Sequence, residues 1–166
     1  MRLIRLAATS ILVPLVLVAA LAGCGGSAAE RIVTVHHGAP TATLVAVDAT
    51  KASPGDVRVF SVPLTDDGGA PMGNLRGTLT TTAIDTPAAG DEIRMTDLVF
   101  SFSKAQDQIV LGGESAYPKD QATIAAGTSI IRPVVGGSGA YNGARGYAET
   151  IHAADGSWKH IFHLLP

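Results

Sequence analysis

From Thr41 to the end of the chain, apolar and polar residues alternate in short runs, and this pattern predicts β-strands. Threonine, valine, isoleucine and glycine dominate the runs, and turn-forming residues separate them every 8–12 residues or so. No run has the 3.6-residue apolar repeat of an amphipathic helix. We therefore expect one all-β domain at residues 41–166. Its eight candidate strands are residues 43–47, 56–64, 74–84, 93–103, 108–115, 122–131, 144–153 and 157–164.

Eight antiparallel strands with short links are typical of two architectures. One is a small closed barrel, which has no exposed strand edges. The other is a sandwich of two sheets. The alternation assigns the residues of each strand to two faces, but it does not say which face points inward. The pattern alone leaves both architectures open.

A glycine cluster near the C-terminus, residues 134–148, predicts a strand, a tight turn and a second strand that bends early. Glycine adopts positive φ and lets backbones approach closely, as a barrel corner requires. The spacing from Gly137 to Gly143 has one residue too many for a G-x-G-x-x-G nucleotide motif, and no P-loop lysine follows. The context of Ser138 ends in Ala140 and so misses G-x-S-x-G. We interpret the cluster as a structural corner.

The N-terminus has the features of an export signal. Arg2 and Arg5 precede an apolar run from Leu6 to Leu21, which is short for a transmembrane helix. The sequence Leu-Ala-Gly-Cys that ends at Cys24 resembles the bacterial lipobox. This resemblance implies that residues 1–23 are removed, that the Cys24 sulfur is acylated, and that membrane lipid holds the protein on the extracytoplasmic face. An ordinary signal peptide or an uncleaved anchor is the alternative.

Residues 24–40 are predicted to form a flexible tether, because they begin with small residues. His36 and His37 are expected to be solvated linker histidines. Cys24 is the only cysteine in the chain, so no disulfide is possible and the hydrophobic core must hold the fold together.

Charge and histidine spacing narrow the chemistry further. Without the arginines of the leader, ten basic residues face 14 acidic ones, so we expect no nucleic-acid partner. His160 and His163 are three apart on a strand and would lie on opposite faces. We therefore predict no metal site, and no motif indicates a cofactor.

The glycine cluster also carries a family resemblance. Residues 133–148 resemble the late glycine motif of dirigent proteins and allene oxide cyclases, which form one superfamily. Residues 55–64, 73–78, 97–102 and 111–117 resemble further strands of these proteins, in the same order. The resemblance implies an eight-stranded antiparallel β-barrel, allene oxide cyclase- or dirigent-like, and self-association as a trimer.

The resemblance carries over one site residue, Tyr117, which falls where the family has a tyrosine after its glycine segment. The early glutamate of the cyclases and the early Phe-His-Asp motif of dirigent proteins are absent. Small barrels often keep an apolar pocket with a few polar groups at one mouth. The candidate catalytic residues are Tyr117, Glu149 and Asp97, and the candidate ligand-binding residues are Tyr147 and Arg76.

Three functions remain open from the sequence. The first is an exported, membrane-anchored barrel that binds a small apolar or aromatic ligand. The second is an isomerase or cyclase, for which Tyr117 and one carboxylate should converge in the pocket. The third is a structural or interaction lipoprotein that works through the outer surface of its barrel.

Overall fold

The computed structural model describes residues 29–119 and 121–166, and this part of the chain is nearly all β. Alternation between inward and outward side chains recurs along most of its strands. The strands are β1 (Arg31–His37), β2 (Thr43–Val45), β3 (Val57–Thr65), β4 (Pro71–Ile84), β5 (Asp91–Phe102), β6 (Gln108–Leu111), β7 (Glu114–Pro118), β8 (Thr128–Ser138), β9 (Gly146–His152) and β10 (Trp158–Leu164), with a 3-10 turn, η1 (Gly139–Tyr141), between β8 and β9.

The predicted leader and Cys24 lie outside the described residues. Within the described ranges, no helix is long and apolar enough to span a bilayer.

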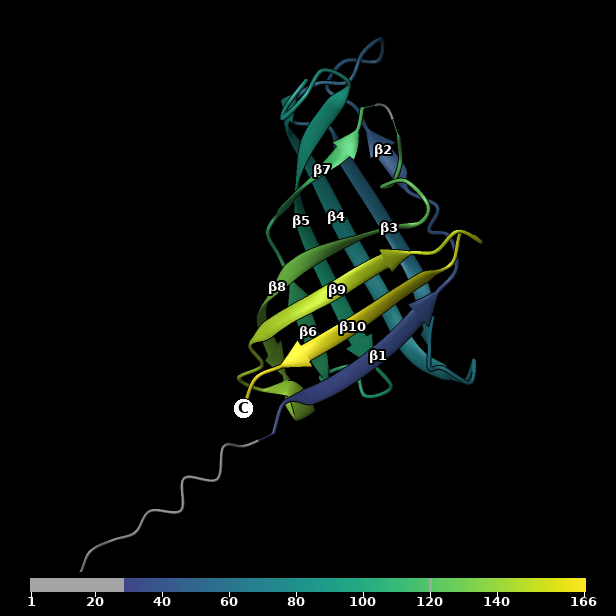
Figure 1. Cartoon of the computed structure of the whole chain (residues 1–166), viewed down its shortest axis with the longest axis vertical. Coiled ribbons are helices and arrows are strands. Elements are labelled where there is room, and N and C mark those ends of the chain that lie inside the picture. Colours follow the sequence, from purple (N-terminus) through teal and green to yellow (C-terminus); the bar gives the residue numbers. More distant parts are fainter. Residues whose placement is uncertain (1–28, 120) are drawn as a thin grey trace, which may run out of the picture.

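The strands form a closed eight-stranded antiparallel barrel, as predicted (Figure 1). The hydrogen-bonded order is β1-β10-β9-β8-β6-β5-β4-β3, and a pairing of His36 with Thr65 joins β1 back to β3. β7 continues the line of β6 along β5, and β2 is a short addition to β3. Closure pairs the strands all the way round, which excludes the sandwich alternative.

The first strand of the barrel corrects the predicted tether. Residues 31–37 form β1, which pairs along its whole length with β10. This pairing buries Val35 and His37, so His37 is not a solvated linker histidine. The apolar run is too short to predict a strand by itself, and its partner lies more than 120 residues away in the sequence. The predicted first strand, residues 43–47, shrinks to the exposed β2.

Two other strand predictions were misplaced. The predicted strand 108–115 is divided into β6 and β7 at Gly112 and Gly113, where Gly113 has φ +101°. The predicted strand 122–131 begins later, at Thr128, and continues to Ser138 as β8. The β-branched and apolar run after Gly127 pairs with β9, whereas residues 121–127 form the loop that leads into it.

The glycine cluster is a barrel corner, as predicted. β8 ends at Ser138, η1 follows, and β9 starts at Gly146, which has φ +130°. A Cβ at Gly146 would overlap the backbone oxygen of His163 on β10. The corner therefore needs glycine at this position, both for its φ and for the close approach of β10.

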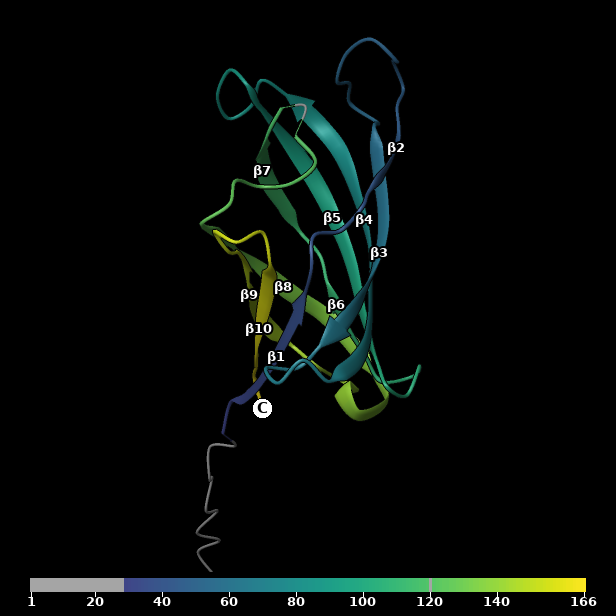
Figure 2. The ribbon, with the colours of Figure 1, turned by 90° about the vertical axis from the view of Figure 1, so that its right-hand side faces the viewer.

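Large apolar side chains form the main core of the barrel. This core includes Leu164, the last residue of β10, which ends close to the C-terminus marked in Figure 1. Phe100 and Phe162 meet edge to face with their ring centroids 4.9 Å apart. The buried apolar residues of this core are Val35, Val62, Leu64, Leu75, Leu98, Phe100, Phe102, Ile109, Leu111, Val134, Ala148, Phe162 and Leu164. Figure 2 shows the opposite end, where β1 diverges from β3 and leads into the segment that precedes β2.

We predict that Gly146→Ala destabilises the barrel by about 3 kcal/mol, because the new Cβ enters backbone and the positive φ strains alanine. Denaturant unfolding followed by circular dichroism measures this loss. Gly136→Ala is the control in the same cluster, since a Cβ at Gly136 meets nothing within 4 Å. It should change stability by less than about 1 kcal/mol. Equal losses in both variants would contradict the corner assignment.

Candidate functional site: a pocket between two barrel walls

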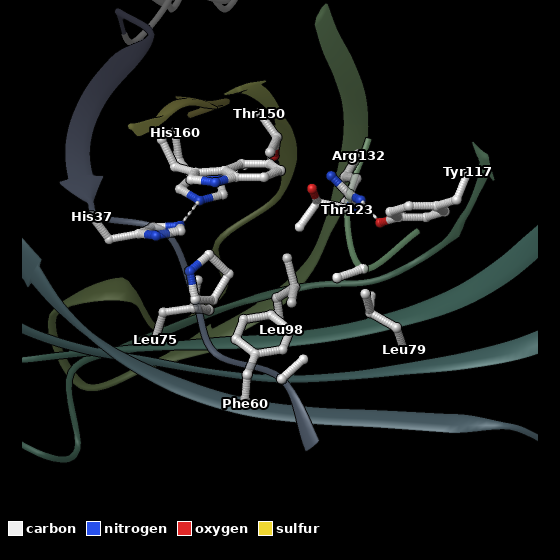
Figure 3. A pocket seen from close by; sticks show the side chains of 14 residues that line it. His37, Phe60, Leu75, Leu79, Leu98, Tyr117, Thr123, Arg132, Thr150 and His160 are labelled. Carbon is white, nitrogen blue, oxygen red and sulfur yellow. Dashed lines mark hydrogen bonds between the residues drawn. The ribbon is translucent and has the colours of Figure 1, made fainter. Parts of the chain in front are cut away.

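A pocket lies between the main core and a second, smaller buried cluster of Leu79, Tyr117, Ile124 and Trp158 (Figure 3). Its cavity volume is about 40 Å³. The pocket is therefore a narrow slot. Its lining residues are His37, Pro40, Ala42, Phe60, Leu75, Leu79, Leu98, Tyr117, Ala122, Thr123, Arg132, Thr150, Trp158 and His160.

The slot exists because two neighbouring pairs of strands separate at this end of the barrel. β1 pairs with β3 at a single position, and the connection after β1 places Pro40 and Ala42 at the pocket. On the other side, β7 pairs with β5 alone, whereas β8 pairs with β6 and β9. The loop between β7 and β8 contributes Ala122 and Thr123.

One wall of the slot is apolar. Leu75 and Leu79 come from β4, Leu98 comes from β5, and Phe60 comes from β3 (Figure 3). Because successive side chains of a strand point to opposite faces, Leu75 and Leu79 both face inward, four residues apart. This wall offers a flat surface for an apolar ligand.

The opposite wall carries a buried histidine pair from β1 and β10. The Nε2 atoms of His37 and His160 lie 3.0 Å apart. His37 Nδ1 lies 2.6 Å from the carbonyl oxygen of Gly38, so it must carry a hydrogen and donate. Nε2 of neutral His37 is then an acceptor, and His160 Nε2 donates to it. His160 Nδ1 consequently accepts from the hydroxyl of Thr150, at 3.0 Å. Every ring nitrogen of the pair is thus satisfied with both rings neutral.

The protonation of the pair agrees with this arrangement. Burial lowers the pKa of His37, although its bond to Gly38 partly opposes the shift. Burial also places the pKa of His160 well below the usual value of 6.5, and His37 and Arg132 lower it further. Both histidines are therefore neutral at pH 7.

Arg132 and Tyr117 connect the two strands that separate at the slot. Arg132 on β8 donates from Nη2 to the hydroxyl oxygen of Tyr117 on β7, at 2.6 Å (Figure 3). Both residues are buried, with 3% and 4% of their surfaces exposed. This side-chain bond lies where the backbone ladder between β7 and β8 is missing. It also holds the guanidinium group at the pocket.

Three side-chain donors around the slot have no partner within the described residues. They are Nε and Nη1 of Arg132 and Nε1 of Trp158, and all three are buried. Burial also lowers the pKa of Arg132, although an arginine side chain stays protonated in proteins. The pocket thus combines an apolar wall with unused hydrogen-bond donors.

A cluster of charged residues lies next to the slot. Glu92 accepts from Arg94 through Oε1, which also lies 3.3 Å from Nη2 of Arg58. The guanidinium carbon of Arg94 sits 4.3 Å from the ring centroid of Tyr117, and Arg94 donates to the carbonyl of Ala122 at 3.0 Å. The cluster therefore holds the ring of Tyr117 in place and fixes the position of the loop between β7 and β8.

Of the five predicted site residues, Tyr117 alone lines the pocket. Asp97 and Arg76 are exposed on the outer face of β5 and β4. Tyr147 and Glu149 lie on the outward face of β9, and Tyr147 stacks on His163 with centroids 4.5 Å apart. The predicted carboxylates do not converge with Tyr117. The carboxylate close to Tyr117 in the ladder is Glu92, whose backbone pairs with it.

The sequence analysis missed His37, His160 and Arg132. His160 had a detectable signal, because it shares a strand face with Trp158, Phe162 and Leu164. A histidine on an otherwise apolar face is normally buried and hydrogen-bonded. Arg132 had a weak signal, because it lies next to Pro133, near which the dirigent resemblance places an arginine, but it is offset from that position and lies just beyond the predicted strand 122–131.

Comparison with known proteins bears on the fold. No protein-family model matches the chain, and no curated protein matches it. Among solved structures, a pyocyanin demethylase aligns with a TM-score of 0.62 and 19% identity, covering 81% of this chain and 99% of that one. A pterocarpan synthase dirigent protein aligns with a TM-score of 0.54 and 19% identity over 83% of this chain and 85% of that one.

A third solved structure is a nonspecific haem-binding cyclase that catalyses a cycloaddition during neoabyssomicin biosynthesis. It aligns with a TM-score of 0.62 and 16% identity, covering 82% of this chain and 68% of that one. At these identities the likeness concerns the fold, and it confirms the architecture that the glycine cluster suggested. The chain therefore has the dirigent and allene oxide cyclase-like β-barrel fold.

Proposed function

We propose that this barrel binds a small, flat and largely apolar ligand in the slot between β4 and β10. The observation that carries the proposal is the slot itself, which has leucines on one wall and a satisfied, neutral histidine pair on the other. Its small cavity volume favours a thin, planar molecule over a branched one. The named activities of the structural neighbours, among them pyocyanin demethylation and cycloaddition, fit a barrel that accepts small organic ligands.

An isomerase or cyclase is the second candidate, and the contact between Tyr117 and Arg132 favours it. The hydroxyl of Tyr117 accepts from Arg132 and keeps its own hydrogen to donate. Two donors directed at one carbonyl oxygen would stabilise negative charge that develops on it during a reaction. Chromatography of the ligand after incubation with the protein separates turnover from simple binding, because an isomerised product elutes at a new position.

We propose in addition that lipid on Cys24 anchors the barrel to a membrane. The support is the sequence Leu-Ala-Gly-Cys after an apolar run, and the place of β1, which starts seven residues after Cys24. The barrel would then lie close to the membrane surface, because so short a connection reaches roughly 25 Å at most when fully extended.

The neutral histidine pair makes stability depend on pH with a definite sign. Both pKa values are lowered by burial in the folded chain, so the unfolded chain binds more protons below pH 6.5. Stability is full above 6.5 and falls as the pH drops below it. The aspartates with lowered pKa values titrate below 3.8 and stay outside this window; they are Asp48, Asp56, Asp85 and Asp155.

Binding of a flat aromatic probe tests the main proposal. Trp158 is the chain's single tryptophan and lines the slot, so its fluorescence reports occupancy directly. We expect phenazine, a neutral three-ring aromatic, to quench it saturably. Leu79→Phe should weaken binding at least tenfold by narrowing the slot, whereas Thr78→Phe, one residue away on the other face of β4, should not. Non-saturating quenching, or equal loss in both variants, would reject the pocket.

The pH dependence is measured by urea unfolding at pH 7.5 and pH 5.5. We expect the wild type to lose on the order of 1–2 kcal/mol of stability between these values, since each such histidine contributes up to about 1.4 kcal/mol per pH unit. His160→Gln should flatten the dependence. His36→Gln should change it only slightly, because His36 is partly exposed, pairs with Asp67 on the surface and is the last of the causes that lower the pKa values of His37 and His160. Parallel pH profiles for the wild type and His160→Gln would show that the buried pair is not responsible.

The anchor is tested by growing bacteria that express the whole chain with an alkyne-bearing fatty acid. We expect label on the wild type and none on Cys24→Ala, which removes the only cysteine. Ser27→Ala is the control and should be labelled normally. Mass spectrometry of the N-terminal peptide should find a lipid-bearing Cys24 as the first residue. Persistent label on Cys24→Ala, or a mature chain that begins elsewhere, would refute the anchor.

A further inference from the structure

The buried charges of the barrel do not balance. Five formally charged residues are buried in the described part of the chain, namely Arg58, Arg94, Arg132, Asp56 and Glu92. Three are cationic and two are anionic, and the histidine pair is neutral. One positive charge is therefore left over inside the protein. An uncompensated buried charge is costly for folding, so its position is informative.

The excess charge belongs to Arg132. Arg58 and Arg94 share Glu92, and Asp56 contributes a further negative charge near Arg58. Arg132 has a neutral partner, the hydroxyl of Tyr117, and forms no ion pair among the described residues. Its side chain nevertheless lines the slot.

Each edge of the Arg132 guanidinium has a donor without a partner. Nη2 is used by Tyr117, whereas Nε and Nη1 are buried and have no partner. These groups belong to one planar guanidinium, whose donors match a carboxylate or another anionic oxygen. The third unused donor of the slot, Nε1 of Trp158, likewise needs an acceptor. The unpartnered side-chain atoms of the slot are all donors.

We propose that the ligand of this barrel carries one anionic oxygen group, such as a carboxylate, enolate or phenolate, and that Arg132 binds it through one edge of its guanidinium, formed by Nη2 with either Nε or Nη1. The apolar body of the ligand lies against Leu75, Leu79 and Leu98. The negative charge of the ligand neutralises the excess positive charge of Arg132. This inference rests on the proposed ligand-binding function and narrows it to flat monoanions.

A purely structural role for Arg132 makes a different prediction. The bond to Tyr117 connects β7 and β8. It occupies only one of the guanidinium donors, and it leaves the positive charge of Arg132 unpaired because its acceptor is a neutral hydroxyl. If bridging were the whole role, loss of Arg132 would affect anionic and neutral ligands alike. Charge selectivity therefore separates the two roles.

The experiment compares two probes that differ in charge but hardly in shape, phenazine-1-carboxylate and phenazine-1-carboxamide. Quenching of Trp158 is titrated at pH 8 in chloride-free buffer, so that the carboxylate is ionised and chloride does not compete. We expect the wild type to bind the carboxylate at least tenfold more tightly than the carboxamide. In Arg132→Met the ratio of the two affinities should fall to about one, with the carboxamide bound nearly as before.

Two further variants keep the test decisive if Arg132→Met folds poorly. Arg132→Lys retains the charge and should keep part of the preference for the carboxylate. Arg76→Met removes an exposed arginine of the outer face of β4 and should keep all of it. Equal affinities in the wild type, or a preference that survives in Arg132→Met, overturn the inference. If phenazine binds and neither derivative does, the anion inference is overturned and the proposed ligand pocket is kept. If none of the three compounds binds, the proposed ligand pocket is rejected as well.

Discussion

Closure of the barrel is the constraint on which the rest of this structure depends. Joining eight strands into a cylinder fixes the width of its interior, and the inward side chains must then fill that width. At one end they do, with Phe100 and Phe162 packed edge to face. At the other end β1 holds β3 at one position and β7 leaves β8, so the wall opens. The slot lies where these two pairs of strands separate within the closed barrel.

The sequence was informative where local physics decides the structure. Alternation of apolar and polar residues grouped Leu98, Phe100 and Phe102 on one face of β5, and all three are buried. Glycine at the corner was predictable for the same reason, because the positive φ of Gly146 excludes most side chains. The strands that were placed correctly lie between clear turn signals, such as the Asp155-Gly156 pair before β10.

Long-range pairing was beyond the reach of such patterns. β1 is a strand because its backbone pairs with β10. The local sequence of residues 31–37 does not predict this pairing. The choice of the inward face is also a tertiary property, which is why Asp97 and Arg76 were proposed as site residues although they face outward. Tyr117 was found through family resemblance. Arg132 was set aside because it is offset from the arginine that the dirigent resemblance places near Pro133, and it lies just beyond the predicted strand.

The two sets of buried polar groups in the slot differ in a way that bears on their roles. His37 and His160 bond to each other, His37 also bonds to Gly38, and His160 also bonds to Thr150. All four ring nitrogens therefore have partners without a ligand, and the pair serves to shape the pocket. Arg132 is satisfied at one of its three nitrogens. A methionine of similar size would cost less in an empty barrel, because it has no charge to bury. The unfinished hydrogen bonding of Arg132 is therefore best explained by what enters the slot.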